Sequence, residues 1–344
     1  MLRKINLFIL IIIPCIISTQ LRACDVPVFR YALERWPAAT YTLTASTGGG
    51  LSAGQGEAIA RCRELSVAQD LKANLRFVTA SVRTGESRLM LTYPLAGGRQ
   101  AEIWSGPLTE ENAGRIAVSP AREMIARRLL DGQAVVWVLL ESGDNDRDQA
   151  AASLLEIELQ KLEKSLSLPE ALSGVAARDL PELKIDFSLV RVSRSDPDEQ
   201  VLVRMLSSTE PDLDAFSGQP MAFPVFGRAR VLYALVGEGI NPETVSRACA
   251  FLVGPCACEI KDLTPGMDLL VAADWQSAVR QSWVNAVDAL PLASLASLAG
   301  RSADASDGER GVFGPVFGIL AAVAAVLAVV VIVSIRMVRS GRNK

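Results

Sequence analysis

The sequence contains no histidine among its 344 residues. A Ser-His-Asp triad, a Cys-His protease pair and a histidine-ligated zinc or haem centre all need an imidazole, so all are excluded. Carboxylate pairs remain open, because the 38 acidic residues offer many pairs and no motif selects among them. The chain also lacks an Asn-x-Ser/Thr sequon, which favours a bacterial envelope over a eukaryotic secretory route.

Charge is absent from the 25 residues between Gly311 and Ile335. As a helix this run would reach roughly 37 Å at about 1.5 Å per residue, enough to cross a hydrocarbon core of about 30 Å with some tilt. Four basic residues follow in the tail 336–344. Lys and Arg beside a span tend to stay in the cytoplasm, so we expect a transmembrane helix over 311–335 with a cytoplasmic C-terminus.

The N-terminus has the pattern of a secretory signal peptide. Arg3 and Lys4 precede a short apolar run from Leu7 to Ile17, and a small residue, Ala23, closes the segment. We therefore expect residues 1–23 to be a cleaved leader. Two alternatives stay open, an uncleaved N-terminal anchor and a lipid on Cys24, since Leu21-Arg22-Ala23-Cys24 resembles a bacterial lipobox.

The exported part is acidic. The leader and the tail hold three and four basic residues, which leaves 28 Lys and Arg against all 38 Asp and Glu, a formal charge of −10. This charge argues against nucleic acid or an anionic membrane surface as the partner. We expect contact with the membrane through the predicted span alone.

The exported part is about 285 residues long, and at roughly 100–200 residues per domain it predicts two domains. Two similar runs of helix and strand patterns divide it at 24–132 and 133–275. A juxtamembrane helix and polar linker are expected over 276–310. The fold class is therefore α/β, with two domains ahead of a transmembrane helix.

The second run has the clearer pattern. Residues 135–140 are an unbroken apolar strand, and leucines at 155, 159, 162 and 166 mark one face of a helix. A strand over 186–192, a helix over 198–206, a hairpin over 221–236 and a helix over 242–252 follow. The first run has a comparable order, but we expect no strand before its first helix, which starts at Pro27.

This order of elements resembles the thioredoxin-like fold, in two copies. Pro224 lies in the strand where that fold usually keeps a cis-proline. The whole chain also resembles a group of uncharacterised bacterial exported proteins with one C-terminal span. A redox-active thioredoxin-like protein would carry Cys-x-x-Cys after its first strand, where the helix dipole lowers a thiol pKa. The matching segment here, Ser142 to Arg147, has no cysteine.

Three aspartates open the long helix of the second run. Asp144, Asp146 and Asp148 have the spacing of the first ligands of a calcium loop. Gln149 stands where that loop needs glycine, and Leu155 stands where it needs glutamate. We therefore interpret the aspartates as a solvated helix start, favoured by the helix dipole.

Five cysteines remain after the predicted leader is removed: Cys24, Cys62, Cys249, Cys256 and Cys258. An odd number in an oxidising compartment leaves at least one thiol over, unless Cys24 carries a lipid. A disulfide between Cys24 and Cys62, and another from Cys249 to Cys256 or Cys258, would be compatible with the spacing. The last three cysteines also fit a labile disulfide with a resolving thiol, or a soft-metal site.

These observations favour a non-catalytic interaction or scaffold protein over an enzyme. We expect a single-pass protein of the bacterial cytoplasmic membrane, with its domains outside, a protein partner and no cofactor or metal. The alternative hypothesis is a thiol–disulfide oxidoreductase or soft-metal carrier that uses Cys249, Cys256 and Cys258.

Overall fold

The computed structural model describes residues 24–67, 73–83, 85–169, 184–256, 261, 266–277 and 279. It is a mixed α/β structure, as the order of patterns predicts. The predicted leader, the predicted span over 311–335 and the basic tail lie outside the described residues. Among the described helices, none combines the length and apolarity that crossing a membrane requires.

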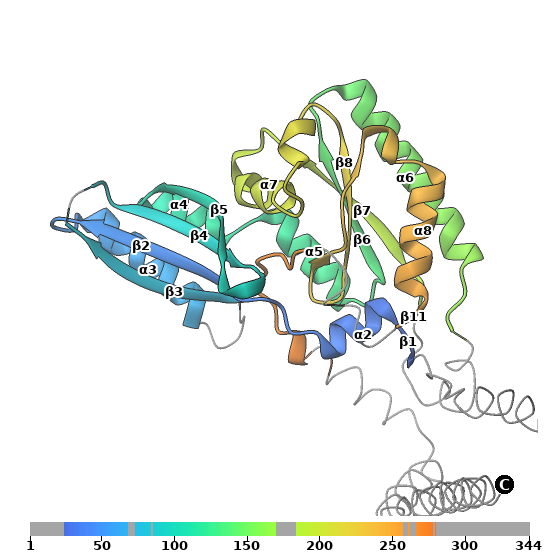
Figure 1. Ribbon diagram of the computed structural model, residues 1–344, viewed down its shortest axis with the longest axis horizontal. Helices are drawn as coiled ribbons and strands as arrows, with labels where there is room; N and C mark the ends of the chain where they lie inside the picture. The colour runs from blue at the N-terminus through green and yellow to red at the C-terminus, as the bar shows by residue number, and fades with distance from the viewer. Residues whose placement is uncertain are drawn as a thin grey trace, which may run out of the picture. The chain divides into compact units, whose positions relative to one another are not determined.

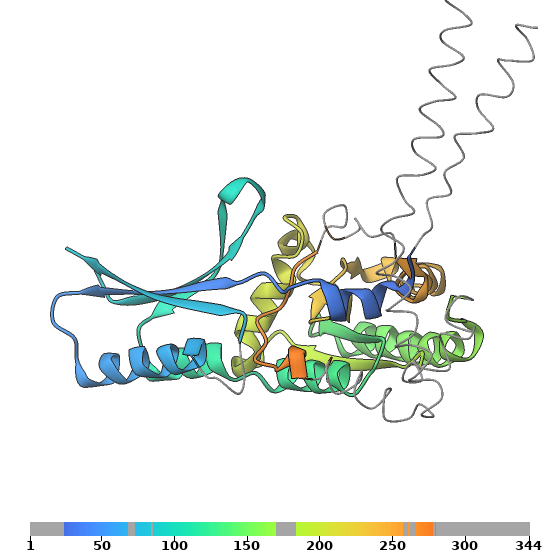
Figure 2. The same cartoon turned by 90° about the horizontal axis from the view of Figure 1, so that it is seen from below.

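The first sheet has four strands in the spatial order β3-β2-β4-β5. Its elements are β2 (Tyr41–Gly48), α3 (Ala53–Val67), β3 (Leu75–Val82), β4 (Arg88–Pro94), β5 (Gln100–Pro107), α4 (Glu110–Ala117) and α5 (Pro120–Leu130). β2 and β3 run parallel, and the other neighbours are antiparallel. Tyr41, Leu43 and Ala45 alternate with less buried residues along β2, so one face of the strand points into the core. Figure 2 shows α3 lying along one face of this sheet.

The second sheet has the spatial order β10-β8-β6-β7, with β9 also paired to β8. Its strands are β6 (Val135–Glu141), β7 (Phe187–Ser193), β8 (Met221–Phe226), β9 (Arg230–Val231) and β10 (Leu235–Val236). Its helices are α6 (Asn145–Ser165), α7 (Gln200–Ser207) and α8 (Pro242–Val253), with the short turns η4 (Pro197–Glu199), η5 (Leu213–Phe216) and η6 (Gly237–Gly239). β6 and β7 are parallel, and β8 is antiparallel to β6.

β6 separates two hydrophobic cores, because successive side chains of a strand point to opposite faces. Val136 and Val138 belong to a core that also holds α5, α7 and the first sheet. Val135 and Trp137 belong to the other core, with α6 and α8 (Figure 1). The unbroken apolar run of β6 is therefore explained by burial on both faces, as the sequence predicts.

Two features of the chain differ from the sequence-based expectation. A short strand, β1 (Cys24–Pro27), does precede the first helix, α2 (Val28–Arg35), and pairs with β11 (Pro255–Cys256). This pairing joins segments more than 200 residues apart, so no local pattern reveals it. The second arm of the predicted hairpin is split into β9 and β10, and Ala229 ahead of it adopts a positive φ of 60°.

The region around Pro224 also differs from the thioredoxin-like expectation. Pro224 lies inside β8, opposite Trp137, and its carbonyl accepts a hydrogen bond from the Leu232 N–H at 3.0 Å. The described residues contain no cis peptide bond, so the bond before Pro224 is trans.

Segments from each end of the described chain pack on the sheet that lies further away in sequence. Val28, Phe29 and Ala32 of α2 belong to the core of the second sheet. In return, residues 267–275 belong largely to the core that contains the first sheet, and Ala272 bridges to Ala73 beside β3. The boundaries predicted at 132 and 275 remain a prediction, but packing crosses between the two sequence halves.

Candidate functional site

The carboxyl ends of the two parallel strands, β6 and β7, meet at one edge of the second sheet. Glu141 at the end of β6 is opposite Ser193 at the end of β7. β8 is antiparallel, so it enters at this same edge, where Met221 pairs with Leu140 and Val236. In open α/β sheets, ligands bind outside the carboxyl ends of parallel strands, which makes this edge the first place to look for a site.

The loop between β6 and α6 is held by two carboxylates, one at the N-cap of α6 and one in its first turn. Asp144 caps α6 by accepting hydrogen bonds from the backbone N–H groups of Asp146 and Arg147 at 3.1 and 3.2 Å. Asp148 accepts three more, from Ser142 N and Oγ at 2.8 Å and from Gly143 N at 2.9 Å. These carboxylates occupy the N–H groups that would otherwise stabilise a thiolate or a bound anion here.

Asp148 corrects one sequence-based interpretation. Its residue surface is only 3% exposed, so it is a buried, hydrogen-bonded group rather than part of a solvated helix start. Asp144 and Asp146 are exposed, as expected for that interpretation. Arg194, which follows β7, is half-buried, and burial lowers the pKa of its guanidinium while the charges of Asp148 and Asp214 oppose this shift. Asp148 therefore stabilises the loop and the adjacent Arg194 together.

A groove of about 730 Å³ opens beside this loop. Its walls come from the first turns of α6, from the turn that enters β8, and from the segment after β10. The lining residues are Arg147, Ala150, Ala151, Leu154, Gln219, Pro220, Val236, Gly237, Glu238 and Ile240. Small apolar side chains form most of this surface, and one arginine and one glutamate bring opposite charges to it.

Gly237 shapes one wall of the groove. Its φ of +51° favours glycine, and a Cβ at this position would lie 1.9 Å from Oε1 of Gln219. The Gly237 N–H donates to the Pro220 carbonyl at 2.9 Å, which ties the segment after β10 to the turn before β8. The two segments therefore form one continuous wall, and a larger residue at 237 would push the Gln219 side chain away.

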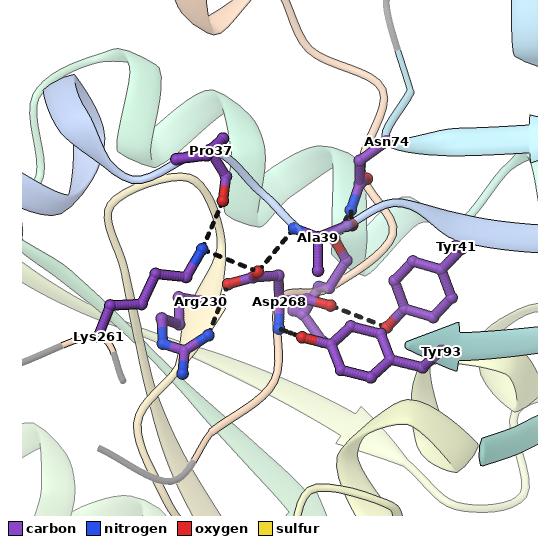
Figure 3. Close-up of polar contacts among 9 residues, drawn as sticks. Pro37, Ala39, Tyr41, Asn74, Tyr93, Arg230, Lys261 and Asp268 are labelled. Atoms are coloured by element: carbon purple, nitrogen blue, oxygen red, sulfur yellow. Dashed lines mark hydrogen bonds and ion pairs between the residues drawn. The ribbon is translucent and has the colours of Figure 1, made fainter. Parts of the chain in front are cut away.

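A cluster of buried polar groups lies elsewhere, around Asp268 (Figure 3). The Asp268 carboxylate accepts hydrogen bonds from Arg230 Nη1 at 3.0 Å and from the Ala39 N–H at 2.8 Å, with Lys261 Nζ 3.6 Å away. The Tyr41 hydroxyl donates to the Asp268 carbonyl at 2.8 Å. The Asp268 N–H donates to the Tyr93 hydroxyl at 3.2 Å.

This cluster joins the two sequence halves. Tyr41 and Tyr93 come from the first sheet and Arg230 from β9, while Asp268 belongs to the segment 267–275. Burial raises the pKa of Tyr41 well above its ordinary value and also raises the pKa of Tyr93, so both hydroxyls stay protonated at neutral pH. The carboxylate, the carbonyl and the N–H group of Asp268 all make hydrogen bonds within the protein, which indicates a structural joint rather than a ligand site.

A second buried carboxylate supports the same region. Glu199 accepts hydrogen bonds from the Ser119 hydroxyl and, at 2.7 Å, from the Ala121 N–H at the start of α5. Arg122 donates to the carbonyls of Leu270 and Ile116 at 2.8 Å each. Burial lowers the pKa of Arg122 to about 10, against the raising effect of Glu199, so Arg122 remains charged at neutral pH.

The predicted cysteine sites are only partly brought together. Cys62 lies in α3 in the core of the first sheet, and Cys249 lies in α8 in the other core. Both are fully buried free thiols, so neither the Cys24–Cys62 bond nor a Cys249 bond to Cys256 or Cys258 is formed. Cys256 is buried in β11, and Cys24 lies opposite it in β1. Cys258 lies outside the described residues.

We expect Cys62 and Cys249 to resist alkylation in the folded protein. Burial raises the pKa of Cys62 to about 11 and that of Cys249 to about 12, so at pH 8 about one Cys62 thiol in a thousand, and fewer of Cys249, are thiolates. Labelling with iodoacetamide at pH 8, read by mass spectrometry with and without urea, should be at least 100-fold slower in the native state. Equal rates at Cys249 would instead support the thiol hypothesis.

Neither the groove nor the Asp268 joint is apparent from the sequence. The groove residues Arg147, Gln219 and Glu238 come from three segments, and only Pro220 and Gly237 carry a local signal, as residues that punctuate strand ends. Asp268 follows a Gly-Met pair with no surrounding periodicity. The residues that form the groove and those that form the Asp268 joint lie far apart in the sequence, so no local pattern predicts either one.

No metal cluster is present in the part of the chain that the structure describes, where no three Cys, Asp or Glu side chains converge. Comparison with protein-family models gives no match for this chain. Neither characterised proteins nor solved structures show a significant similarity to it.

Proposed function

We propose that this chain is a non-catalytic interaction protein of the bacterial cell envelope. In this proposal the predicted C-terminal span holds two thioredoxin-like modules outside the cytoplasmic membrane, where they bind a partner protein. The observation that carries it is the loop between β6 and α6. At the place where a thiol oxidoreductase of this topology needs a cysteine pair, Asp144 accepts from the N–H groups of Asp146 and Arg147 at the helix start. Asp148 accepts from the N–H groups of Ser142 and Gly143 in the loop before it.

The strand orders support the thioredoxin-like part of the proposal. Each sheet places its first strand between a parallel and an antiparallel neighbour, in the orders β3-β2-β4-β5 and β7-β6-β8-β10. Each also follows its first strand with a helix, α3 or α6, before the parallel strand. The first copy lacks a helix between β3 and β4, and the second has a divided last strand.

The groove beside α6 supplies a binding surface for the proposed partner. Its apolar walls suit one or two apolar side chains of an extended segment, and Arg147 and Glu238 suit charged neighbours of either sign. The alternative, thiol chemistry at Cys249, has less support because that side chain is fully buried with a pKa raised to about 12. We therefore favour binding over catalysis.

Filling the groove should strongly reduce capture of the partner. A photo-cross-linking amino acid in place of Glu238 in the full-length chain should trap one specific envelope protein in intact cells. Adding Ala150→Trp, which places an indole in the groove, should reduce that product at least ten-fold, which corresponds to about 1.4 kcal/mol of binding free energy. The measurement is the yield of the cross-linked product on an immunoblot, identified by mass spectrometry.

A matched control lies on the same helix. Ile157 is 65% exposed and does not line the groove, so Ile157→Trp should leave the yield unchanged. Trapping that survives Ala150→Trp would rule out the groove as the binding surface. Trapping no specific protein from position 238, or from any other exposed position along α6, would count against the interaction function itself.

A further inference from the structure

β1 and β11 form a two-stranded antiparallel ribbon in which Cys24 lies directly opposite Cys256. Opposed residues in antiparallel pairs have Cα atoms about 4.5–5.5 Å apart. Disulfides form across Cα separations of about 4.4–6.8 Å, so a regular pair in this register falls within the range. The pairing is irregular between Cys24 and Pro27, and the bond itself is not formed in the structure. We propose that a disulfide between Cys24 and Cys256 clasps the start of the exported chain to β11, the strand that follows α8.

The surrounding contacts hold both strands in place. The Val28 N–H donates to the Gly254 carbonyl at 3.0 Å, directly beside the ribbon. Val28 and Phe29 are buried in the core that contains α8, so α2 fastens the segment that follows Cys24 (Figure 1). The pairing of Cys24 with Cys256 therefore extends an interface that already exists.

The other described cysteines do not compete for this bond. Cys62 and Cys249 are fully buried free thiols, each in a different core. This assignment replaces the pairings that spacing alone allows, and it leaves three cysteines of the exported part outside the bond, namely Cys62, Cys249 and Cys258. It also excludes a lipid on Cys24, because one sulfur cannot carry both a thioether and a disulfide.

The bond forms by two thiol–disulfide exchanges. One thiolate attacks the disulfide of an oxidised thiol oxidoreductase or of a small-molecule disulfide, which gives a mixed disulfide and releases one thiol of the oxidant. The second thiolate attacks the cysteine sulfur of that mixed disulfide, and the oxidant leaves as a dithiol or two thiols. The protein loses two protons and two electrons, and the oxidant gains them. The clasp rests on the proposed exported location, since the cytoplasm keeps thiols reduced.

The test is made on the full-length protein, extracted from membranes without reductant and alkylated before denaturation. Peptide mass spectrometry should find the peptides that contain Cys24 and Cys256 joined by a disulfide. Cys62 and Cys249 should be alkylated only in a parallel sample that is unfolded before labelling. Reduction should lower the melting temperature by roughly 5–15 °C, because the bond closes a loop of more than 200 residues. Alkylated Cys24, lipid-bearing Cys24 or a bond from Cys24 to Cys258 would each overturn the proposal.

Three variants and one added oxidant complete the experiment. Cys24→Ser should remove the joined peptide and make the melting temperature insensitive to reductant. Cys256→Ser should also remove the joined peptide. Cys258→Ser should preserve both the joined peptide and the effect of reductant on the melting temperature. If the joined peptide is absent from cells, the proposal fails, and oxidised glutathione then identifies the reason. If the bond then forms in the purified protein, the proposed exported location is wrong. If it does not form, the pairing of Cys24 with Cys256 is wrong.

Discussion

Asp268→Ala should lower the free energy of unfolding by about 3–5 kcal/mol, the usual cost of leaving one partner of a buried ion pair without the other. Arg230 would keep its charge in a site where its side chain is only 8% exposed. The Ala39 N–H would lose its acceptor as well. The measurement is guanidinium denaturation of the full-length chain in detergent, followed by near-ultraviolet circular dichroism.

Two controls separate the charge from the packing at this joint. Lys261→Ala should cost less than about 1 kcal/mol, because Lys261 is 26% exposed and lies 3.6 Å from the Asp268 carboxylate. The double variant Asp268→Leu with Arg230→Met should recover much of the loss, since removing both charges leaves no buried ion uncompensated. An Asp268→Ala protein as stable as the original would contradict the assignment of Asp268 as a structural joint.

Arg122→Met should be comparably destabilising, by about 3–5 kcal/mol. Arg122 is 4% exposed, and loss of its guanidinium would leave the carbonyls of Leu270 and Ile116 without these donors in a buried site. It would also remove the positive charge near the buried Glu199 carboxylate. Thermal unfolding followed by circular dichroism, together with denaturant titration, measures the effect.

Arg115 provides the matched control for Arg122. It lies in α4, where it pairs at 2.7 Å with Glu111, whose side chain is 70% exposed. Exposed i,i+4 pairs contribute little, so Arg115→Met should change the free energy of unfolding by less than about 1 kcal/mol. Equal effects at Arg122 and Arg115 would mean that burial of the guanidinium contributes nothing to stability.

Much of the local structure is visible in the sequence. The strand predicted over 135–140 coincides with β6, the hairpin predicted over 221–236 begins with β8, and the leucine spacing from 155 to 166 locates α6. Ser119 and Pro120 separate α4 from α5, because Ser119 caps the second helix and Pro120 opens it. These features depend on neighbours a few residues apart, which a sequence displays directly.

The candidate site was much less predictable. Asp148 and Asp144 look alike in the sequence, yet Asp148 is buried and accepts hydrogen bonds from Ser142 and Gly143, while Asp144 is exposed. The groove needs α6, the turn before β8 and the segment after β10 at one edge. The order of the strands in the sheet brings these three segments together, and that order depends on pairing between residues far apart in the sequence.

The sequence by itself determined the absence of imidazole chemistry, the lack of a Cys-x-x-Cys pair at the start of α6, and the α/β class, because composition and short-range periodicity carry them. Only the tertiary structure decided which cysteines are buried and which two lie opposite each other. It also decided that Asp268 joins β9 to the first sheet. Those contacts connect residues that are dozens to hundreds of positions apart, and they exist only once the sheets have formed and packed.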